Sequence, residues 1–258
     1  MTGAGSPTPS AALLEVRGLR VVFDGFAAID GLDFTVEEGE LRFLIGPNGA
    51  GKTTLIDVVT GLTKPASGSV RFGGEELVGK REHHIVRMGV GRTFQTATVF
   101  EELTVVENLD LADSFRLPLR SLFRRRRGVS DAVASALEAA DLTALADRPA
   151  GVLSHGQRQW LEIGMLLVQK PKLLLLDEPV AGMSRSERER TGELLHRIAS
   201  THTVVVVEHD MEFLRKYARK VTVLHQGHVL REGSVAEVQE DPEVREVYLG
   251  RAKGKAVT

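Results

Sequence analysis

The stretch Gly46-Pro47-Asn48-Gly49-Ala50-Gly51-Lys52-Thr53-Thr54 decides the fold of this chain. It follows the apolar run Leu41–Ile45, which predicts a buried strand, and it precedes residues 55–59, which predict the first turns of a helix. A glycine-rich loop with the pattern G-x-x-x-x-G-K-[ST] between a strand and a helix is typical of a phosphate-binding loop. The sequence therefore predicts an α/β protein that binds a nucleoside triphosphate.

The residue types of this loop explain how it binds phosphate. Glycines allow successive backbone N–H groups to turn inward around an anion, and the N-terminus of the following helix adds its dipole. We expect Lys52 to reach the β- and γ-phosphates and the Thr53 hydroxyl to be a ligand of Mg²⁺. The residues predicted to contact the nucleotide here are Gly46, Asn48, Gly49, Ala50, Gly51, Lys52, Thr53 and Thr54.

Composition restricts the class of protein. Of the 258 residues, 42% are hydrophobic and 26% are charged, as in a globular protein that buries a core. The formal net charge of −2 argues against a dedicated nucleic-acid-binding protein, which usually carries a strong basic excess. The chain has no cysteine, no apolar run near the ~18 residues that span a bilayer, and no signal peptide in residues 1–10. We expect a protein of the reducing cytoplasm that reaches a membrane only through partners.

Alternating apolar residues precede the phosphate loop. Residues 14–17, 19–23 and 32–36 predict a small antiparallel sheet. Phe23 belongs to this sheet, where its ring either packs in the core or stacks on a nucleotide base.

The composition of the sequence changes between Gln95 and roughly Gly151. Strand signals stop, and Leu, Ala, Glu and Arg dominate, which predicts an inserted helical lobe. The lobe contains Arg124-Arg125-Arg126-Arg127, a run typical of a solvated face, with a contact to anionic lipid or to a partner as the alternative.

A second helix start follows this lobe. Ser154 and Gln157 have the S-x-x-Q spacing of a capping box, and Gly156 lies between them. A helix N-terminus of this kind is either a simple cap or a second site for an anion.

Acidic residues follow two buried strands. Residues 172–176 form a continuous apolar run, as expected for a parallel strand that is covered on both faces, and the pattern repeats in the β-branched strand predicted at residues 203–207. Ligands bind at the carboxyl ends of such strands. Asp177 is therefore expected to hold Mg²⁺, and Glu178 to orient or deprotonate an attacking water. His209 follows the second strand, where it either contacts a γ-phosphate or is structural.

Together these motifs resemble the nucleotide-binding subunit of ATP-binding-cassette (ABC) transporters, over roughly residues 13–250. The order matches from the phosphate loop through Gln95 of the Q-loop, the signature motif at 153–157, the acidic strand end at 173–178 and the switch histidine His209. Two positions depart from the family pattern. His155 replaces the first of two glycines in the usual signature motif, and Ser184 stands where the family often has Asp.

The resemblance implies an α/β P-loop NTPase fold with a RecA-like core, an N-terminal antiparallel β subdomain and an inserted α-helical subdomain. The core is expected to span residues 13–95 and 156–250, and the helical subdomain residues 96–155, with the signature motif at its end. Residues 1–12 are expected to be a disordered tail, and residues 251–258 are expected to be a basic, frayed tail.

The resemblance also implies roles for single residues toward ATP and Mg²⁺. Phe23 would stack on adenine, and Gln95 would sense the metal and the attacking water. The implied catalytic residues are Glu178, His209, Gln95 and Lys52. The implied metal ligands are Thr53, Gln95 and Asp177. Ser154, Gly156 and Gln157 would face ATP held by a partner subunit, so that two chains enclose two nucleotides.

Within the family the chain is most similar to the importers of branched-chain amino acids and urea. Residues 153–165, 178–183 and 247–250 are particularly similar to the urea-importer ATPase subunit. The resemblance implies an ATPase at the cytoplasmic face of a membrane, bound to permease subunits and a second ATP-binding subunit, indirectly to a solute-binding protein, and not to nucleic acid. We predict urea as the solute, with branched-chain or other amino acids or amides as the alternative.

Three other functions fit the sequence less well. Soluble cassette ATPases that act on nucleic acid or ribosomes typically carry two cassettes or a long coiled-coil insertion, and neither is visible here. A nucleotide-binding module without hydrolysis is disfavoured by the presence of Glu178 and His209. A small-molecule kinase would leave the signature helix unexplained.

Overall fold

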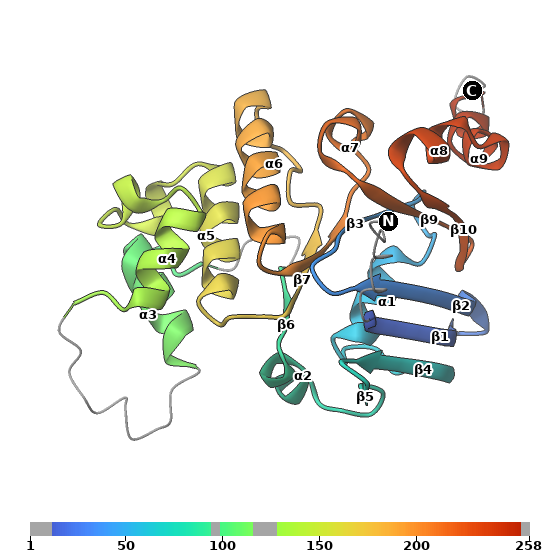
Figure 1. Cartoon of the computed structure of the whole chain (residues 1–258), viewed down its shortest axis with the longest axis horizontal. Coiled ribbons are helices and arrows are strands. Elements are labelled where there is room, and N and C mark those ends of the chain that lie inside the picture. The colour runs from blue at the N-terminus through green and yellow to red at the C-terminus, as the bar shows by residue number, and fades with distance from the viewer. Residues whose placement is uncertain (1–11, 94–98, 116–127, 254–258) are drawn as a thin grey trace, which may run out of the picture.

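The computed structural model describes residues 12–93, 99–115 and 128–253, which form two sheets surrounded by helices (Figure 1). The strands are β1 (Ala12–Phe23), β2 (Phe26–Glu37), β3 (Leu41–Ile45), β4 (Ser67–Phe72), β5 (Glu75–Glu76), β6 (Val90–Arg92), β7 (Leu173–Asp177), β8 (Thr203–Val207), β9 (Lys220–His225) and β10 (His228–Gly233). The helices are α1 (Lys52–Val59), α2 (Glu82–Met88), α3 (Val105–Ser114), α4 (Asp131–Ala139), α5 (His155–Leu167), α6 (Arg185–Ala199), α7 (Met211–Tyr217), α8 (Val235–Glu240) and α9 (Pro242–Lys253).

The larger sheet positions the site. Its strand order is β10-β9-β3-β8-β7-β6, with β9, β3, β8, β7 and β6 parallel and β10 antiparallel to β9. Leu44 of β3 pairs with Val207 of β8, which pairs with Asp177 of β7. Because these three residues are level, the segments that follow β3, β7 and β8 meet at one edge of the sheet.

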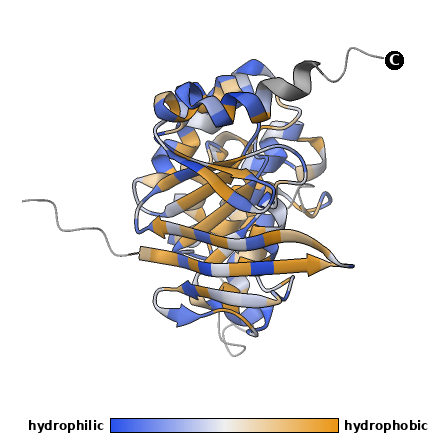
Figure 2. Ribbon diagram, turned by 90° about the vertical axis from the view of Figure 1, so that its right-hand side faces the viewer, coloured by the Kyte–Doolittle hydropathy of each residue, from blue (hydrophilic) through white to orange (hydrophobic). Residues whose placement is uncertain are grey.

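Alternate residues of the central strands pack into two cores. Phe43, Leu174 and Val206 face a core shared with α5 and α6, whereas Leu44 and Val207 face a core shared with α1 and the smaller sheet. That smaller sheet is antiparallel in the order β2-β1-β4-β5. Figure 2 shows the hydrophobic colouring concentrated on the strands. Burial on both faces explains why β3, β7 and β8 read as unbroken apolar runs.

The helices α3, α4 and α5 gather on the side of the molecule away from the smaller sheet (Figure 1). A Cβ added at Gly164 in α5 would lie 3.2 Å from the side chain of Leu109 in α3, so these two helices are in close contact. The predicted fold class is confirmed, namely an α/β core with an antiparallel β part and an inserted group of helices. The proposed boundaries between subdomains stay a prediction.

The ends of the chain differ in detail from the expectation. Ala12 belongs to β1, and residues 251–253 extend α9 rather than forming a tail. The helical stretch at the C-terminus is divided into α8 and α9 because Pro242 has no N–H to continue a helix and begins a new one. Three predictions concern residues outside the described part of the chain, namely those on the rest of both tails, on Gln95 and on the four arginines at 124–127. No helix in the described part of the chain is both long and apolar enough to cross a bilayer.

Candidate active site

The phosphate loop connects β3 to α1 and leaves the start of the helix open. Gly51 is the residue before α1, with φ 100° and no side-chain cap on the helix. A Cβ at this position would lie 2.8 Å from the backbone oxygen of Ala28, so only glycine fits against β2. The uncapped N–H groups of α1 are therefore free to bind an anion.

Lys52 folds back over this loop. Its Nζ atom donates hydrogen bonds to the backbone oxygens of Gly46 at 2.7 Å and Pro47 at 3.2 Å. Burial lowers the pKa of Lys52, and the nearby Glu178 and Asp177 carboxylates oppose this shift. The ammonium group thus lies between the loop and the two acidic residues, where a phosphate would meet it.

A cleft of about 490 Å³ opens above the loop. It brings together most residues that the sequence predicts for one nucleotide. Its lining residues are Phe23, Phe26, Ala28, Asn48, Gly49, Ala50, Gly51, Lys52, Thr53, Thr54, Glu178 and Val207. The volume is within the range of small-molecule sites.

Phe26 is a cleft residue that sequence reasoning missed. Phe23 and Phe26 are directly paired at the end of the β1–β2 hairpin, and their exposed fractions are 48% and 68%. Paired residues of an antiparallel hairpin point to the same face, so both rings can reach one ligand. The signal was present in the sequence, because Asp24-Gly25, with φ 47° and 83°, is a typical two-residue hairpin turn.

Asp177, the last residue of β7, has the character of a metal ligand. Its side chain is 3% exposed, and burial is the main cause that raises its pKa. Its Oδ2 atom accepts no hydrogen bond from the described residues and lies 3.7 Å from Nη2 of Arg92. A buried carboxylate oxygen without a hydrogen bond fits a hard cation such as Mg²⁺. The described residues contain no cluster of three or more His, Cys, Asp or Glu, so nucleotide phosphates would have to complete the coordination.

Glu178 and His209 come together from adjacent strand ends. The Nδ1 atom of His209 lies 3.4 Å from Oε1 of Glu178, and the side chain of His209 is exposed whereas that of Glu178 is partly buried. The backbone N–H of Glu178 donates to the oxygen of Val207 at 2.9 Å. With φ 49°, Glu178 has a backbone conformation that non-glycine residues rarely adopt, which directs its carboxylate into the cleft.

Glu208 is a second residue that sequence reasoning missed. Its side chain is buried, and its Oε2 atom accepts hydrogen bonds from the backbone of His209 at 2.9 Å and Asp210 at 3.3 Å. Its Oε1 atom accepts one from the backbone of Val180 at 3.3 Å. Burial raises the pKa of Glu208, and these hydrogen bonds oppose the shift. Glu208 therefore holds together the segments that follow β7 and β8. Its signal in the sequence is a carboxylate directly after four consecutive valines of a predicted strand.

The signature residues lie apart from the cleft, at the N-terminus of α5. The predicted capping box is confirmed, because the Gln157 N–H donates to Oγ of Ser154 at 3.2 Å and the Ser154 N–H donates to Oε1 of Gln157 at 3.0 Å. None of Ser154, Gly156 and Gln157 lines the cleft. His155 contacts the backbone oxygen of Ala181 through Nε2 at 3.1 Å, and Ser184 caps α6. The N-terminus of α5 is therefore a capped helix end that lies outside the cleft, and its use as a second site for an anion stays a prediction.

Comparison with known proteins identifies the family. The sequence profile of the ABC transporter matches residues 29–181. The chain belongs to the ABC transporter family. A second profile, that of the branched-chain amino acid ATP-binding cassette transporter, matches residues 232–253 of this ABC ATPase.

Relatives of the ABC ATPase match it from end to end. It is 39% identical to the high-affinity branched-chain amino acid transport ATP-binding protein BraF of Pseudomonas aeruginosa, with 94% of this chain and 100% of the relative covered. It is 37% identical to the protein LivG of Salmonella typhimurium, which has the same description, over the same shares. Among solved structures, the ADP conformation of the ATP-binding cassette MJ1267 is similar with a TM-score of 0.82 and 32% identity, covering 93% of this chain and 100% of that one.

Proposed function

We propose that this ABC ATPase powers the import of branched-chain amino acids through partner membrane subunits. The observation that carries the proposal is its end-to-end similarity to branched-chain amino acid transport ATP-binding proteins. The match of residues 232–253 to a branched-chain amino acid cassette adds support. These findings favour the amino-acid alternative drawn from the sequence over urea, which the motif resemblance had placed first.

ATP would lie along the cleft with its phosphates on the loop between β3 and α1. The open N–H groups of α1 and the ammonium group of Lys52 would bind the β- and γ-phosphates. The adenine would stack on Phe23, and Phe26 would supply a second apolar surface beside it.

Thr53, Asp177 and Gln95 are the residues proposed to hold Mg²⁺. The buried Oδ2 of Asp177 and the exposed Thr53 support this role, whereas Gln95 lies outside the described residues. Bound there, Mg²⁺ would neutralise negative charge that develops on the phosphates. Asp177 needs to be ionised for this role, and Lys52 and Arg92 favour its ionised form.

Glu178 is proposed to act on the water that attacks the γ-phosphate. Its carboxylate lines the cleft, and it is the acidic side chain best placed to orient the water or accept its proton. His209 would contact the γ-phosphate, and Glu208 would keep His209 in position through the backbone.

The second site for an anion would serve a neighbouring cassette. Ser154, Gly156 and Gln157 are proposed to cap ATP that is held by a second ATP-binding subunit, and the resulting closure would drive permease subunits at the cytoplasmic face of the membrane. A solute-binding protein would deliver the amino acid. The location of these residues outside the cleft supports this arrangement, and the net charge of −2 disfavours nucleic acid as the partner.

The test is purification of the cassette with its permease subunits from the native membrane, followed by phosphate release in proteoliposomes. We expect leucine, isoleucine or valine with the matching solute-binding protein to stimulate ATP turnover. Stimulation by urea and not by these amino acids would reassign the solute. Turnover that responds to DNA or ribosomes, without copurifying membrane subunits, would refute the importer function.

A further inference from the structure

Glu187 joins the N-termini of two helices through one carboxylate. Its Oε1 atom accepts a hydrogen bond from Oγ of Ser154, the cap of α5, at 2.7 Å. Its Oε2 atom accepts hydrogen bonds from the N–H and Oγ of Ser184, the cap of α6, at 2.9 and 2.8 Å. A negative charge therefore lies at the start of both helices, where their dipoles favour it.

The same carboxylate lies against the signature glycine. A Cβ added at Gly156 would be 2.7 Å from Oε1 of Glu187, so there is no space for a side chain between them. The hydroxyl of Ser154 is the largest cause that holds the pKa of Glu187 below its usual range, and the hydrogen bonds of Ser184 add to it. Glu187 is thus ionised near neutral pH and occupies the end of α5 that our proposed function gives to a phosphate.

The backbone around Glu187 is fixed on both sides of α6. Toward α5, Nε1 of Trp160 donates to Oγ1 of Thr191 at 2.9 Å, and that hydroxyl donates to the backbone oxygen of Glu187 at 2.9 Å. Toward α7, Arg188 donates to Asp210 at 2.6 Å. A displaced carboxylate must therefore leave by rotation of its own side chain.

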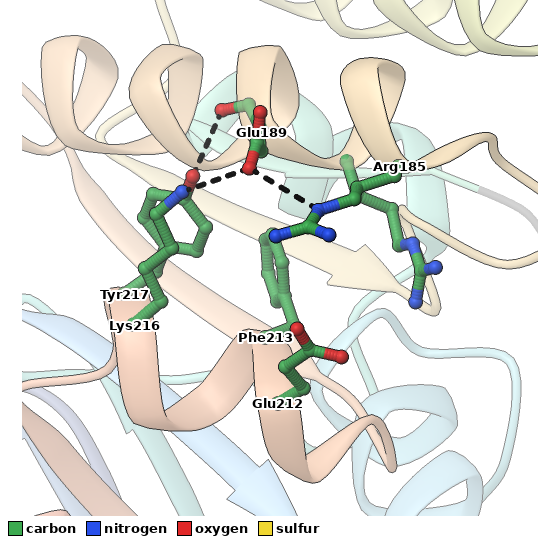
Figure 3. Close-up of a pocket in the computed structure, with 7 residues that line it drawn as sticks. Arg185, Glu189, Glu212, Phe213, Lys216 and Tyr217 are labelled. Atoms are coloured by element: carbon green, nitrogen blue, oxygen red, sulfur yellow. Dashed lines mark hydrogen bonds and ion pairs between the residues drawn. The ribbon is translucent and has the colours of Figure 1, made fainter.

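The next glutamate of α6 has different surroundings. Glu189 faces α7 (Figure 3). Its Oε1 atom lies 3.2 Å from Nζ of Lys216 in α7, and its backbone oxygen accepts a hydrogen bond from the hydroxyl of Tyr217. The same Oε1 atom lies 3.7 Å from Nε of Arg185, one turn earlier in α6. On the same side of α6, a Cβ at Gly192 would lie 2.3 Å from the ring of Tyr217. Glu189 is therefore a matched control, because it has the same charge on the same helix but no contact with α5.

We propose that Glu187 is a resident anion of the signature helix: its carboxylate occupies the phosphate-binding end of α5 and is displaced when the γ-phosphate of the neighbouring ATP reaches Ser154. This inference rests on the proposed function. A phosphate and a carboxylate that both contact Ser154 would repel each other. The hydroxyl of Ser154 has one proton, so it donates a hydrogen bond to only one of them at a time. Glu187 thereby raises the ATP concentration that closes the two cassettes.

The test uses the complex with its permease subunits and companion cassette in proteoliposomes, with ATP as the titrant. In Glu187→Gln the charge is removed at constant shape, and in Glu187→Asp the carboxylate keeps its charge at the cap of α6 but is too short to reach Ser154. Since a charge-assisted hydrogen bond no longer competes, we expect both variants to reach half-maximal turnover at an ATP concentration roughly three- to tenfold lower. Glu189→Gln should leave this concentration unchanged.

Each outcome decides the inference. If both Glu187 variants behave like Glu189→Gln, or need more ATP than the unmodified complex, Glu187 does not compete with phosphate and the inference is overturned while the proposed function stands. If Glu187→Gln does not fold, as judged from the fluorescence of the single tryptophan, Glu187→Asp alone decides. An unmodified complex that turns over no ATP overturns the proposed function, and this inference with it.

Discussion

The Nδ1 atom of His209 lies 3.4 Å from Oε1 of Glu178, and the two residues follow neighbouring parallel strands. Val207 connects them, because its backbone oxygen accepts the N–H of Glu178. The register of β7 against β8 thus sets the distance between Glu178, the proposed base, and His209, the proposed switch histidine. The pairing of the two strands therefore brings the two side chains together.

Glu178→Gln should separate binding from hydrolysis. The amide has the shape of the carboxylate and inherits the same left-handed backbone, but it cannot accept a proton. We expect turnover to fall by about 10²–10⁴-fold. ATP affinity should be retained, because a general base stabilises the transition state and not the bound ground state. Phosphate release and equilibrium nucleotide binding measure the two quantities. Hydrolysis close to normal would assign the base to another residue.

Lys52→Ala should act on binding. Removing the ammonium group takes away a charge-assisted contact to phosphate, so we expect ATP affinity to fall roughly tenfold or more. Lys64→Ala, a change at an exposed lysine beyond α1, is the control and should have no effect. The measurement is titration calorimetry with ATP and Mg²⁺. Equal affinity in the Lys52 variant and the control would remove Lys52 from the phosphate site.

The aromatic pair at the tip of the β1–β2 hairpin should recognise the base. Phe26→Ala and Phe23→Ala are each expected to weaken ATP binding by roughly two- to tenfold, the contribution of one aromatic contact. Phe100 is 51% exposed outside the cleft, so Phe100→Ala tests for a general effect of losing an exposed ring. An effect of Phe23→Ala alone would leave Phe26 without a role.

The stability contributed by Glu187 should depend on pH. Its pKa in the folded chain is lowered from the ordinary value of 4.5, so its ionised form stabilises the fold fully above pH 4.5. This contribution is lost as the pH falls through the lower, folded-state pKa. We therefore expect the difference in free energy of unfolding between the unmodified chain and Glu187→Gln to be largest at neutral pH and to shrink in acid. Urea unfolding followed by Trp160 fluorescence measures it, and a difference independent of pH would contradict the assignment.

Much of the site could be predicted because its residues follow local rules. The phosphate loop, the strand ends at Asp177 and His209 and the Ser154 capping box are each recognised from a few adjacent residues. Parallel strands then bring these segments to one edge, which is a property of the fold class.

The residues that were missed depend on contacts between distant segments. Glu187 looks like an ordinary helix-capping residue until α5 is placed beside α6, and Glu208 gains its role from the backbone of Val180, 28 positions earlier. The solute is a different case. The cleft of this chain is built for a nucleotide, so it carries no chemistry that distinguishes urea from an amino acid, and only the relatives favour one over the other.

The packing at Gly192 has a genetic consequence. The ring of Tyr217 covers this position so closely that even a methyl group would push α7 off α6, and the N-terminus of α7 is capped by Asp210, the neighbour of His209. A missense change here would leave every nucleotide-binding motif intact yet disturb the His209 segment. A strain carrying such an allele would lose growth on the imported nutrient, and inspection of the motifs alone would not reveal the lesion.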